Sequence, residues 1–193
     1  MKYFTNYWPH IRNNNLMGEA KSKVLFNELI LTENVEGNIC EIGCFQGKTS
    51  KMMNMVFPHK ILELYDTFEG VQGVDPTIDV VPNGIFACPL DEVKAFVGEN
   101  NVQYFKGFFP NTFDNTKDTK YSFIHSDTDT YIGTKSTLDV MWDRVSVNGI
   151  LMFDDYIWKD CPGVEKAVHE WLPNRTDCIT RITPYQIAIQ KTK

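Results

Sequence analysis

Apolar residues recur along the chain in two alternating patterns. Short apolar runs that end in Gly or an acidic residue, such as NICEIG at 38–43, are typical of buried parallel strands. Segments with apolar residues three and four positions apart, such as KTSKMMNMVF at 48–57, are typical of amphipathic helices. The patterns predict strands over 38–43, 61–66, 102–107, 121–127 and 149–155, and helices over 17–31, 48–57, 89–97, 133–145 and 162–172.

Strand and helix therefore alternate along most of the chain. Such alternation favours a parallel sheet with helices on both faces. The final segments, CITRI and YQIAIQK, are joined by a turn and predict an antiparallel pair. We expect an α/β, Rossmann-like doubly wound, mostly parallel seven-stranded sheet with a C-terminal antiparallel hairpin. It forms a single domain over 1–193, with an N-terminal helical segment over 1–37.

One long stretch, 67–88, breaks the alternation. It is rich in Gly, Pro and Asp, and loops of this length are usually functional. We expect a lid over a ligand, with Phe68 and Phe86 either packing against that ligand or joining the core.

Composition narrows the class of protein. The chain has 193 residues and a net charge of -6, which gives no reason to expect a nucleic-acid partner. No apolar run has the length of a signal peptide core or a membrane span, so we expect no membrane partner. Five cysteines without a C-x-x-C pair favour reduced thiols and a cytoplasmic location.

The candidate chemistry lies where the predicted strands end, because ligands of open α/β sheets bind there. These positions are mostly acidic: Glu41, Gly43, Asp66, Gly107, Asp127, Asp129, Asp154 and Asp155. An acidic rim fits poorly with a triphosphate. The P-loop interpretation of EIGCFQGKTS also fails on spacing, since three residues rather than four separate Gly43 from Gly47.

A different cofactor suits this stretch. Gly43 allows a tight turn, and the helix after it offers free N–H groups to a carboxylate. Glu41 can attract an ammonium group, and Asp66 can accept hydrogen bonds from ribose hydroxyls. An amino acid joined to a ribose describes S-adenosylmethionine. The alternative is that Glu41 and Asp66 only cap neighbouring helices.

The acids of the fourth and fifth strands suggest a metal site. Mg²⁺ prefers oxygen ligands, and two strand ends supply three carboxylates here, from Asp127, Asp154 and Asp155. Without a cation, these carboxylates would raise one another's pKa. The alternatives are that Asp127 or Asp129 caps the following helix, and that Asp154 and Asp155 only form a turn.

Five motifs occur in the order seen in the macrocin O-methyltransferase family, which this sequence resembles from about 38 to about 172. They are EIGCFQGKTS, YDTFEG, GFFPNTF, SDTDTYIGTKSTLD and ILMFDDY. The most specific parts are D-x-D-x-Y at Asp127, Asp129 and Tyr131, and D-D-Y at Asp154, Asp155 and Tyr156.

The resemblance implies a class I S-adenosylmethionine-dependent methyltransferase that needs Mg²⁺ and methylates a hydroxyl of a sugar-bearing small molecule. It implies metal ligands at Asp127, Asp154 and Asp155. The implied cofactor contacts are Glu41, Gly43, Phe45, Gly47, Thr49, Asp66 and Asp127. The region before the first strand, which in the family helps to build the acceptor pocket and the dimer, is short here, and a homodimer is an open expectation.

The proton acceptor has no family match, because Thr130 stands where catechol-type relatives carry a Lys. We take Asp129 as the candidate catalytic base and interpret His125, inside an apolar strand, as a core histidine. Three alternative functions stay open: methylation of a phenolic or other hydroxyl acceptor, a non-catalytic cofactor-binding module, and a P-loop-like nucleotide-binding enzyme.

Overall fold

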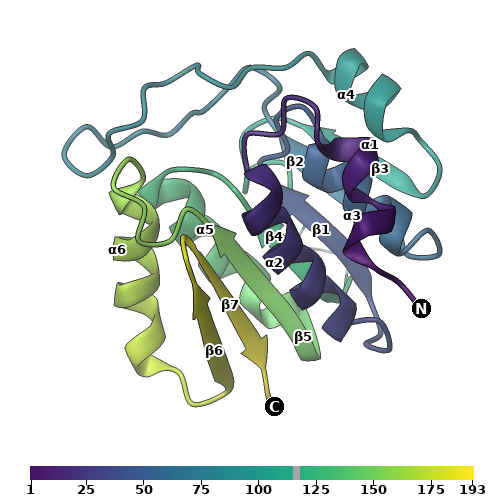
Figure 1. Ribbon diagram of the computed structural model, residues 1–193. Helices are drawn as coiled ribbons and strands as arrows, with labels where there is room; N and C mark the ends of the chain where they lie inside the picture. Colours follow the sequence, from purple (N-terminus) through teal and green to yellow (C-terminus); the bar gives the residue numbers. More distant parts are fainter. Residues whose placement is uncertain (115–117) are drawn as a thin grey trace.

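A single seven-stranded sheet forms the centre of the protein in the computed structural model, which describes residues 1–114 and 118–193 (Figure 1). The strands lie in the order β3-β2-β1-β4-β5-β7-β6. The first five run parallel, and β7 pairs antiparallel with both β5 and β6. The predicted α/β sheet with its C-terminal hairpin is confirmed. The strands are β1 (Asn38–Ile42), β2 (Leu62–Asp66), β3 (Val102–Lys106), β4 (Tyr121–Ser126), β5 (Val145–Asp154), β6 (Cys178–Thr183) and β7 (Gln186–Lys191).

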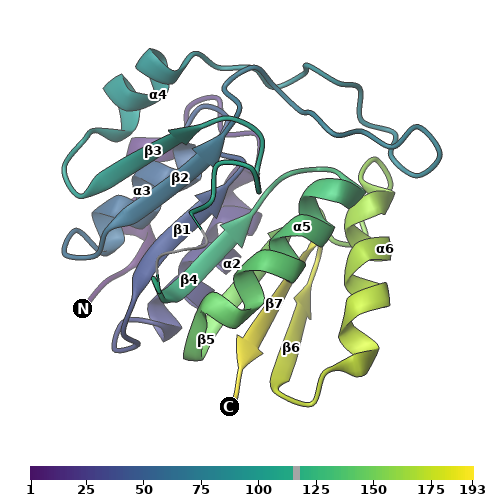
Figure 2. The same ribbon diagram turned by 180° about the vertical axis from the view of Figure 1, so that it is seen from behind.

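Helices cover both faces of the sheet, as the turned view in Figure 2 shows. One apolar core lies between the sheet and α1 (Trp8–Ile11), α2 (Gly18–Leu31), α3 (Lys48–Val56) and α4 (Leu90–Val97). A second core lies under α5 (Tyr131–Met141) and α6 (Pro162–Trp171). Three short 3-10 turns complete the described elements: Phe4–Asn6, Trp142–Arg144 and Leu172–Asn174. No helix in the described part of the chain has the length and apolar character needed to cross a bilayer.

The helix predicted over 133–145 is shorter and lies earlier than expected. It begins at Tyr131 because the Thr130 hydroxyl accepts a hydrogen bond from the Gly133 N–H at 3.1 Å, so Thr130 is the N-cap and neither Asp127 nor Asp129 is. The helix ends at Met141, where Trp142 turns into the second core. Val145, predicted to be helical, is instead the first residue of β5 and pairs with Tyr121.

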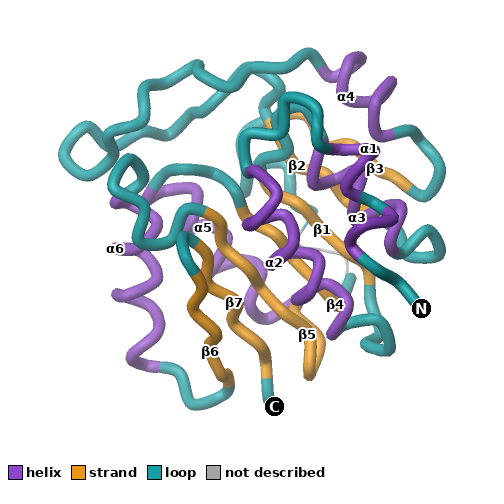
Figure 3. The backbone as a smooth tube through the Cα atoms, in the orientation of Figure 1, coloured by secondary structure: helices purple, strands orange, loops and turns teal. Residues whose placement is uncertain are grey.

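The 67–88 stretch is irregular, and it passes over the carboxyl ends of the strands from the side of α4 towards α6 (Figure 3). Asp79 anchors it, because its carboxylate accepts the Tyr131 N–H at the start of α5 (2.9 Å) and the Asp75 N–H (2.9 Å). Phe68 is buried in the first core, whereas Phe86 is 44% exposed and faces the cavity described below. Phe68 therefore belongs to the core, and Phe86 lies where it could contact a ligand.

Candidate active site

A cavity of about 490 Å³ opens over the carboxyl ends of the parallel strands, beneath the 67–88 stretch. This volume is in the usual range for a small-molecule site. The fold brings seven of the predicted site residues to its wall: Gly43, Phe45, Asp66, Asp127, Asp129, Asp154 and Asp155. The other three, Glu41, Gly47 and Thr49, lie outside the wall.

Asp66 organises the β2 end of the cavity. One carboxylate oxygen accepts the backbone N–H groups of Cys44 (2.7 Å) and Phe45 (3.1 Å), and the other accepts that of Phe68 (2.7 Å). Asp66 thus joins the loop after β1 to the loop after β2. A carboxylate has about four acceptor positions, so Asp66 keeps room for about one more donor from a ligand.

The two glycines of the EIGCFQGKTS motif, Gly43 and Gly47, allow neighbouring elements to pack closely. Gly43 has φ 82°, and a Cβ there would lie 2.1 Å from the backbone oxygen of Asp127, so only glycine lets the ends of β1 and β4 approach. Gly47 has φ 73°, and a Cβ there would lie 2.5 Å from the Val97 side chain. Gly47 therefore lies against α4, away from the cavity.

Glu41 and Thr49 belong to a buried polar network below the cavity. The Glu41 carboxylate is fully buried and accepts hydrogen bonds from the Thr49 and Ser50 hydroxyls of α3. His125 of β4 lies with Nδ1 2.8 Å from the same carboxylate. These contacts link β1, α3 and β4, and His125 is a fully buried core histidine, as expected from the sequence.

The acids at the carboxyl ends of β4 and β5 form a compact cluster. One oxygen from each of Asp127, Asp154 and Asp155 lies within 4.8 Å of the others. The Oδ1 atom of Asp154 is buried and has no hydrogen-bond partner within residues 1–114 and 118–193. An all-oxygen set with a free buried ligand atom fits a hard divalent cation such as Mg²⁺.

The electrostatics of the cluster also favour a cation. Burial, followed by repulsion from Asp154, raises the pKa of Asp127 well above its usual range. Burial and the neighbouring Asp155 raise the pKa of Asp129 to about 7. Burial raises the pKa of Asp154 as well, although Lys21 opposes that shift. A bound cation would relieve this repulsion.

Lys21 is a site residue that the sequence analysis missed. Its ammonium nitrogen lies 2.8 Å from Asp154 Oδ2 and 2.7 Å from Asp155 Oδ1. Burial alone would lower the Lys21 pKa, but the charges of Asp154, Asp127 and Asp155 outweigh it and raise that pKa. No sequence pattern pairs a lysine in α2 with an acid that follows it by 134 residues, as Asp155 does.

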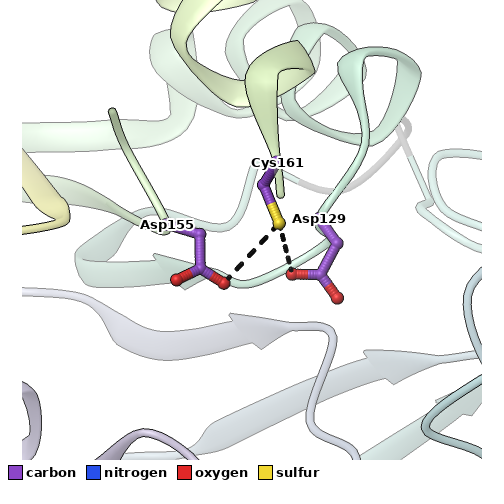
Figure 4. A group of neighbouring side chains, drawn as sticks. All are labelled: Asp129, Asp155 and Cys161. Atoms are coloured by element: carbon purple, nitrogen blue, oxygen red, sulfur yellow. Dashed lines mark hydrogen bonds between the residues drawn. The ribbon is translucent and has the colours of Figure 1, made fainter. Parts of the chain in front are cut away.

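Cys161, at the start of α6, is a second missed neighbour (Figure 4). Its sulfur lies 3.7 Å from Asp129 Oδ1 and 3.9 Å from Asp155 Oδ2. Burial raises the pKa of the Cys161 thiol, which therefore stays protonated and can donate its single S–H weakly to either carboxylate. The sequence indicated only a reduced thiol, in the core or at the surface.

Apolar and aromatic side chains line the remaining wall. Trp158 and Tyr185 meet edge to face, with ring centroids 4.6 Å apart, beside the β5 end of the acid cluster. Leu16 and Met17, just before α2, complete this side. At the β2 end, Phe86 of the 67–88 stretch packs against Phe45 at 5.5 Å. The cavity thus has two apolar ends with an acidic centre.

Comparison with known proteins identifies the family. The sequence profile of the Macrocin-O-methyltransferase (TylF) family matches residues 6–182. The chain belongs to this family. The match covers nearly the whole chain and confirms the resemblance that the motifs indicated.

A curated relative from Streptomyces olivaceus is 26% identical to the chain over 162 residues. It is the 8-demethyl-8-(2,3-dimethoxy-alpha-L-rhamnosyl)-tetracenomycin-C 4'-O-methyltransferase. The alignment covers 75% of this chain, and the chain spans only 61% of the relative's length.

Solved structures of O-methyltransferases share the fold. The O-methyltransferase NovP aligns with a TM-score of 0.77 at 22% identity, over 91% of this chain and 81% of NovP. The MycE methyltransferase of the mycinamycin biosynthetic pathway, solved with Mg and SAH, aligns with a TM-score of 0.59 at 13% identity, over 100% of this chain and 49% of MycE. The protein therefore has the α/β Rossmann-like fold of these methyltransferases.

Proposed function

We propose that this protein is a metal-dependent O-methyltransferase that moves a methyl group from S-adenosylmethionine to a hydroxyl of a sugar-bearing small molecule. The observation that carries the proposal is the cluster of Asp127, Asp154 and Asp155, which shares one cavity with the glycine loop after β1. Family membership and the rhamnosyl acceptor in the name of the Streptomyces olivaceus relative support it.

The β2 end of the cavity suits the cofactor. S-adenosylmethionine supplies the methyl group on a sulfonium. Asp66 has acceptor capacity left for a ribose hydroxyl, and Phe45 and Phe86, which pack against each other, would offer an apolar surface to the adenine. Gly43 and Asp127, whose backbones lie against each other in the cavity wall, would contact the cofactor there. Glu41, Gly47 and Thr49 act indirectly, by holding β1, α3 and α4 in place.

The acid cluster would hold the metal through Asp127, Asp154 and Asp155. A divalent cation bound there would lower the pKa of an acceptor hydroxyl and orient its oxygen. Asp129 faces the same cavity and accepts the hydroxyl proton on a carboxylate oxygen, while the Cys161 thiol orients its Oδ1 atom. His125 is fully buried beneath the site and takes no part in proton transfer.

The acceptor lies at the β5 end, against Trp158, Tyr185, Leu16 and Met17. Aromatic faces pack well against the C–H face of a sugar, which supports a glycosylated acceptor. The same edge-to-face pair could hold a phenolic ring, so a phenol is the second candidate acceptor. The cytoplasmic location and the homodimer stay predictions from the sequence.

Asp154→Asn tests the metal role. We expect turnover to fall about a hundredfold or more, since even the outer partners of metal ligands contribute 10- to 100-fold. Binding of S-adenosylhomocysteine, measured by calorimetry, should persist, because the proposed ribose and adenine contacts lie at the β2 end, whereas Asp154 belongs to the acidic centre of the cavity. Turnover would be measured with Mg²⁺ and a panel of rhamnosylated and phenolic acceptors, before and after chelation.

The matched control is Asp160→Asn, which makes the same chemical change at an exposed position of the nearby loop. Normal turnover by Asp154→Asn, or by the chelated wild type, would refute the metal role. Binding of ATP in place of S-adenosylhomocysteine would refute the methyltransferase assignment. Cofactor binding without turnover on any acceptor would favour a non-catalytic module.

A further inference from the structure

Lys21 makes ion pairs with two members of the acid cluster. Its nitrogen lies between Asp154 Oδ2 and Asp155 Oδ1, at 2.8 Å and 2.7 Å, and only 18% of the side chain is exposed. A Mg²⁺ ion binds oxygens at about 2.0–2.1 Å, so carboxylates that share it must approach one another closely. The Lys21 ammonium group lies between the Asp154 and Asp155 carboxylates, in the space that a shared metal ion would need.

A positively charged side chain at the position of Lys21 is unfavourable for the helix itself. It lies in the first turn of α2 (Gly18–Leu31), where the helix dipole favours acids and disfavours cations. The acid cluster, rather than the helix, therefore accounts for this lysine. Four carboxylates line the cavity here, and one lysine lowers their repulsion without neutralising them.

The side chain can leave the cluster without movement of the helix. Leu25, Phe26 and Leu29 of α2 are buried in the first core and hold the helix against the sheet. Lys21 borders the cavity, so a rotation about its own side-chain bonds would move the ammonium group into that space.

We propose that Lys21 is a built-in counter-ion, which holds the acid cluster together in the metal-free protein and is displaced when a divalent cation binds. The inference rests on the proposed function, because it assumes that Asp154 and Asp155 are metal ligands. According to the inference, metal binding replaces the Lys21 ammonium group by a divalent cation. The affinity of the protein for the metal therefore depends partly on Lys21.

The first test compares Mg²⁺ binding by calorimetry in the wild type and in Lys21→Met, with MgCl₂ as the only ligand. Methionine keeps much of the length of the side chain and removes its charge. We expect the affinity for Mg²⁺ to rise about tenfold. Lys23→Met is the matched control, since Lys23 is exposed on the same helix and the change in net charge is identical. It should bind Mg²⁺ as the wild type does.

The outcomes separate this inference from the proposed function. Equal or weaker binding by Lys21→Met than by the wild type would overturn the counter-ion role and leave the metal site standing. An absence of Mg²⁺ binding in both proteins would overturn the metal site, and the counter-ion role with it.

A second test uses the wild type and does not depend on the folding of a variant. Lysine acetylation by acetic anhydride, followed by mass spectrometry, reports which amines are free. We expect Lys21 to be protected without metal and to become several-fold more reactive on addition of Mg²⁺, while Lys23 reacts equally in both states. Unchanged protection of Lys21 at saturating Mg²⁺ would overturn the inference.

Discussion

At the scale of single residues, unusual backbone conformations concentrate around the cavity. Residues other than glycine rarely adopt positive φ, and such strain is commonly found at functional sites. Five cavity residues adopt it here: Phe45 (45°), Phe86 (59°), Asp129 (60°), Asp155 (54°) and Tyr185 (65°). The chain thus holds aromatic and acidic side chains at turns where glycine would be more stable.

Tyr185 gives a direct test of this trade-off. It follows Pro184 in the β6–β7 turn, at a position that glycine normally takes in a type II turn. Tyr185→Gly and Tyr185→Ala both remove the ring, but only glycine relieves the strain. We expect Tyr185→Gly to be more stable than Tyr185→Ala by about 1 kcal/mol in urea unfolding. A more stable alanine variant would show that the turn is not strained.

At the scale of secondary-structure elements, Glu41 joins β1 to α3 and β4. Its buried carboxylate receives the Thr49 and Ser50 hydroxyls and lies against His125, so it can hold the glycine loop in place without contact with the ligand. The sequence predicted a cofactor contact for Glu41. It shows that an acid lies near the end of the strand, but it does not show that Thr49, Ser50 and His125 already contact the carboxylate.

Glu41→Gln distinguishes the two roles. The amide keeps the shape of the side chain but places an NH₂ group against hydroxyl donors, so we expect a loss of about 2 kcal/mol in the free energy of unfolding. Calorimetry on the folded variant should find the affinity for S-adenosylhomocysteine close to that of the wild type. Strongly weakened binding with unchanged stability would instead support a direct contact to the cofactor.

At the scale of the whole molecule, the cavity joins distant parts of the chain. Met17 and Lys21 come from the N-terminal segment, the acids from β4 and β5, and Tyr185 from the C-terminal hairpin. All these segments pack on one sheet. Ligand binding should therefore stabilise the protein as a single unit.

Scanning calorimetry tests this cooperativity. At a hundredfold excess over its dissociation constant, S-adenosylhomocysteine should add about 2.7 kcal/mol to the free energy of unfolding. For a chain of this length, that gain corresponds to roughly 5–10 °C in Tm. We expect one transition that moves as a whole. A second transition that does not respond to the ligand would show that part of the chain unfolds independently.

The sequence by itself determined the alternation of strands and helices, the final hairpin and the acidic rim of the sheet. These features are local, because strand and helix periods and turn residues are encoded within a few positions. The family motifs at Asp127, Asp129, Asp154 and Asp155 could be recognised for the same reason, since each is a short run at a strand end.

Only the tertiary structure decided which of these residues share the cavity. Glu41 and Asp127 both lie at strand ends, yet Glu41 lies below the cavity and Asp127 lines it. Lys21 forms an ion pair with Asp155, which is 134 positions away in the sequence. Trp158, in the loop between β5 and α6, packs against Tyr185 in the turn between β6 and β7. Such contacts depend on the order of the strands in the sheet and on the position of α2 against it. Neither can be predicted from a local pattern in the sequence.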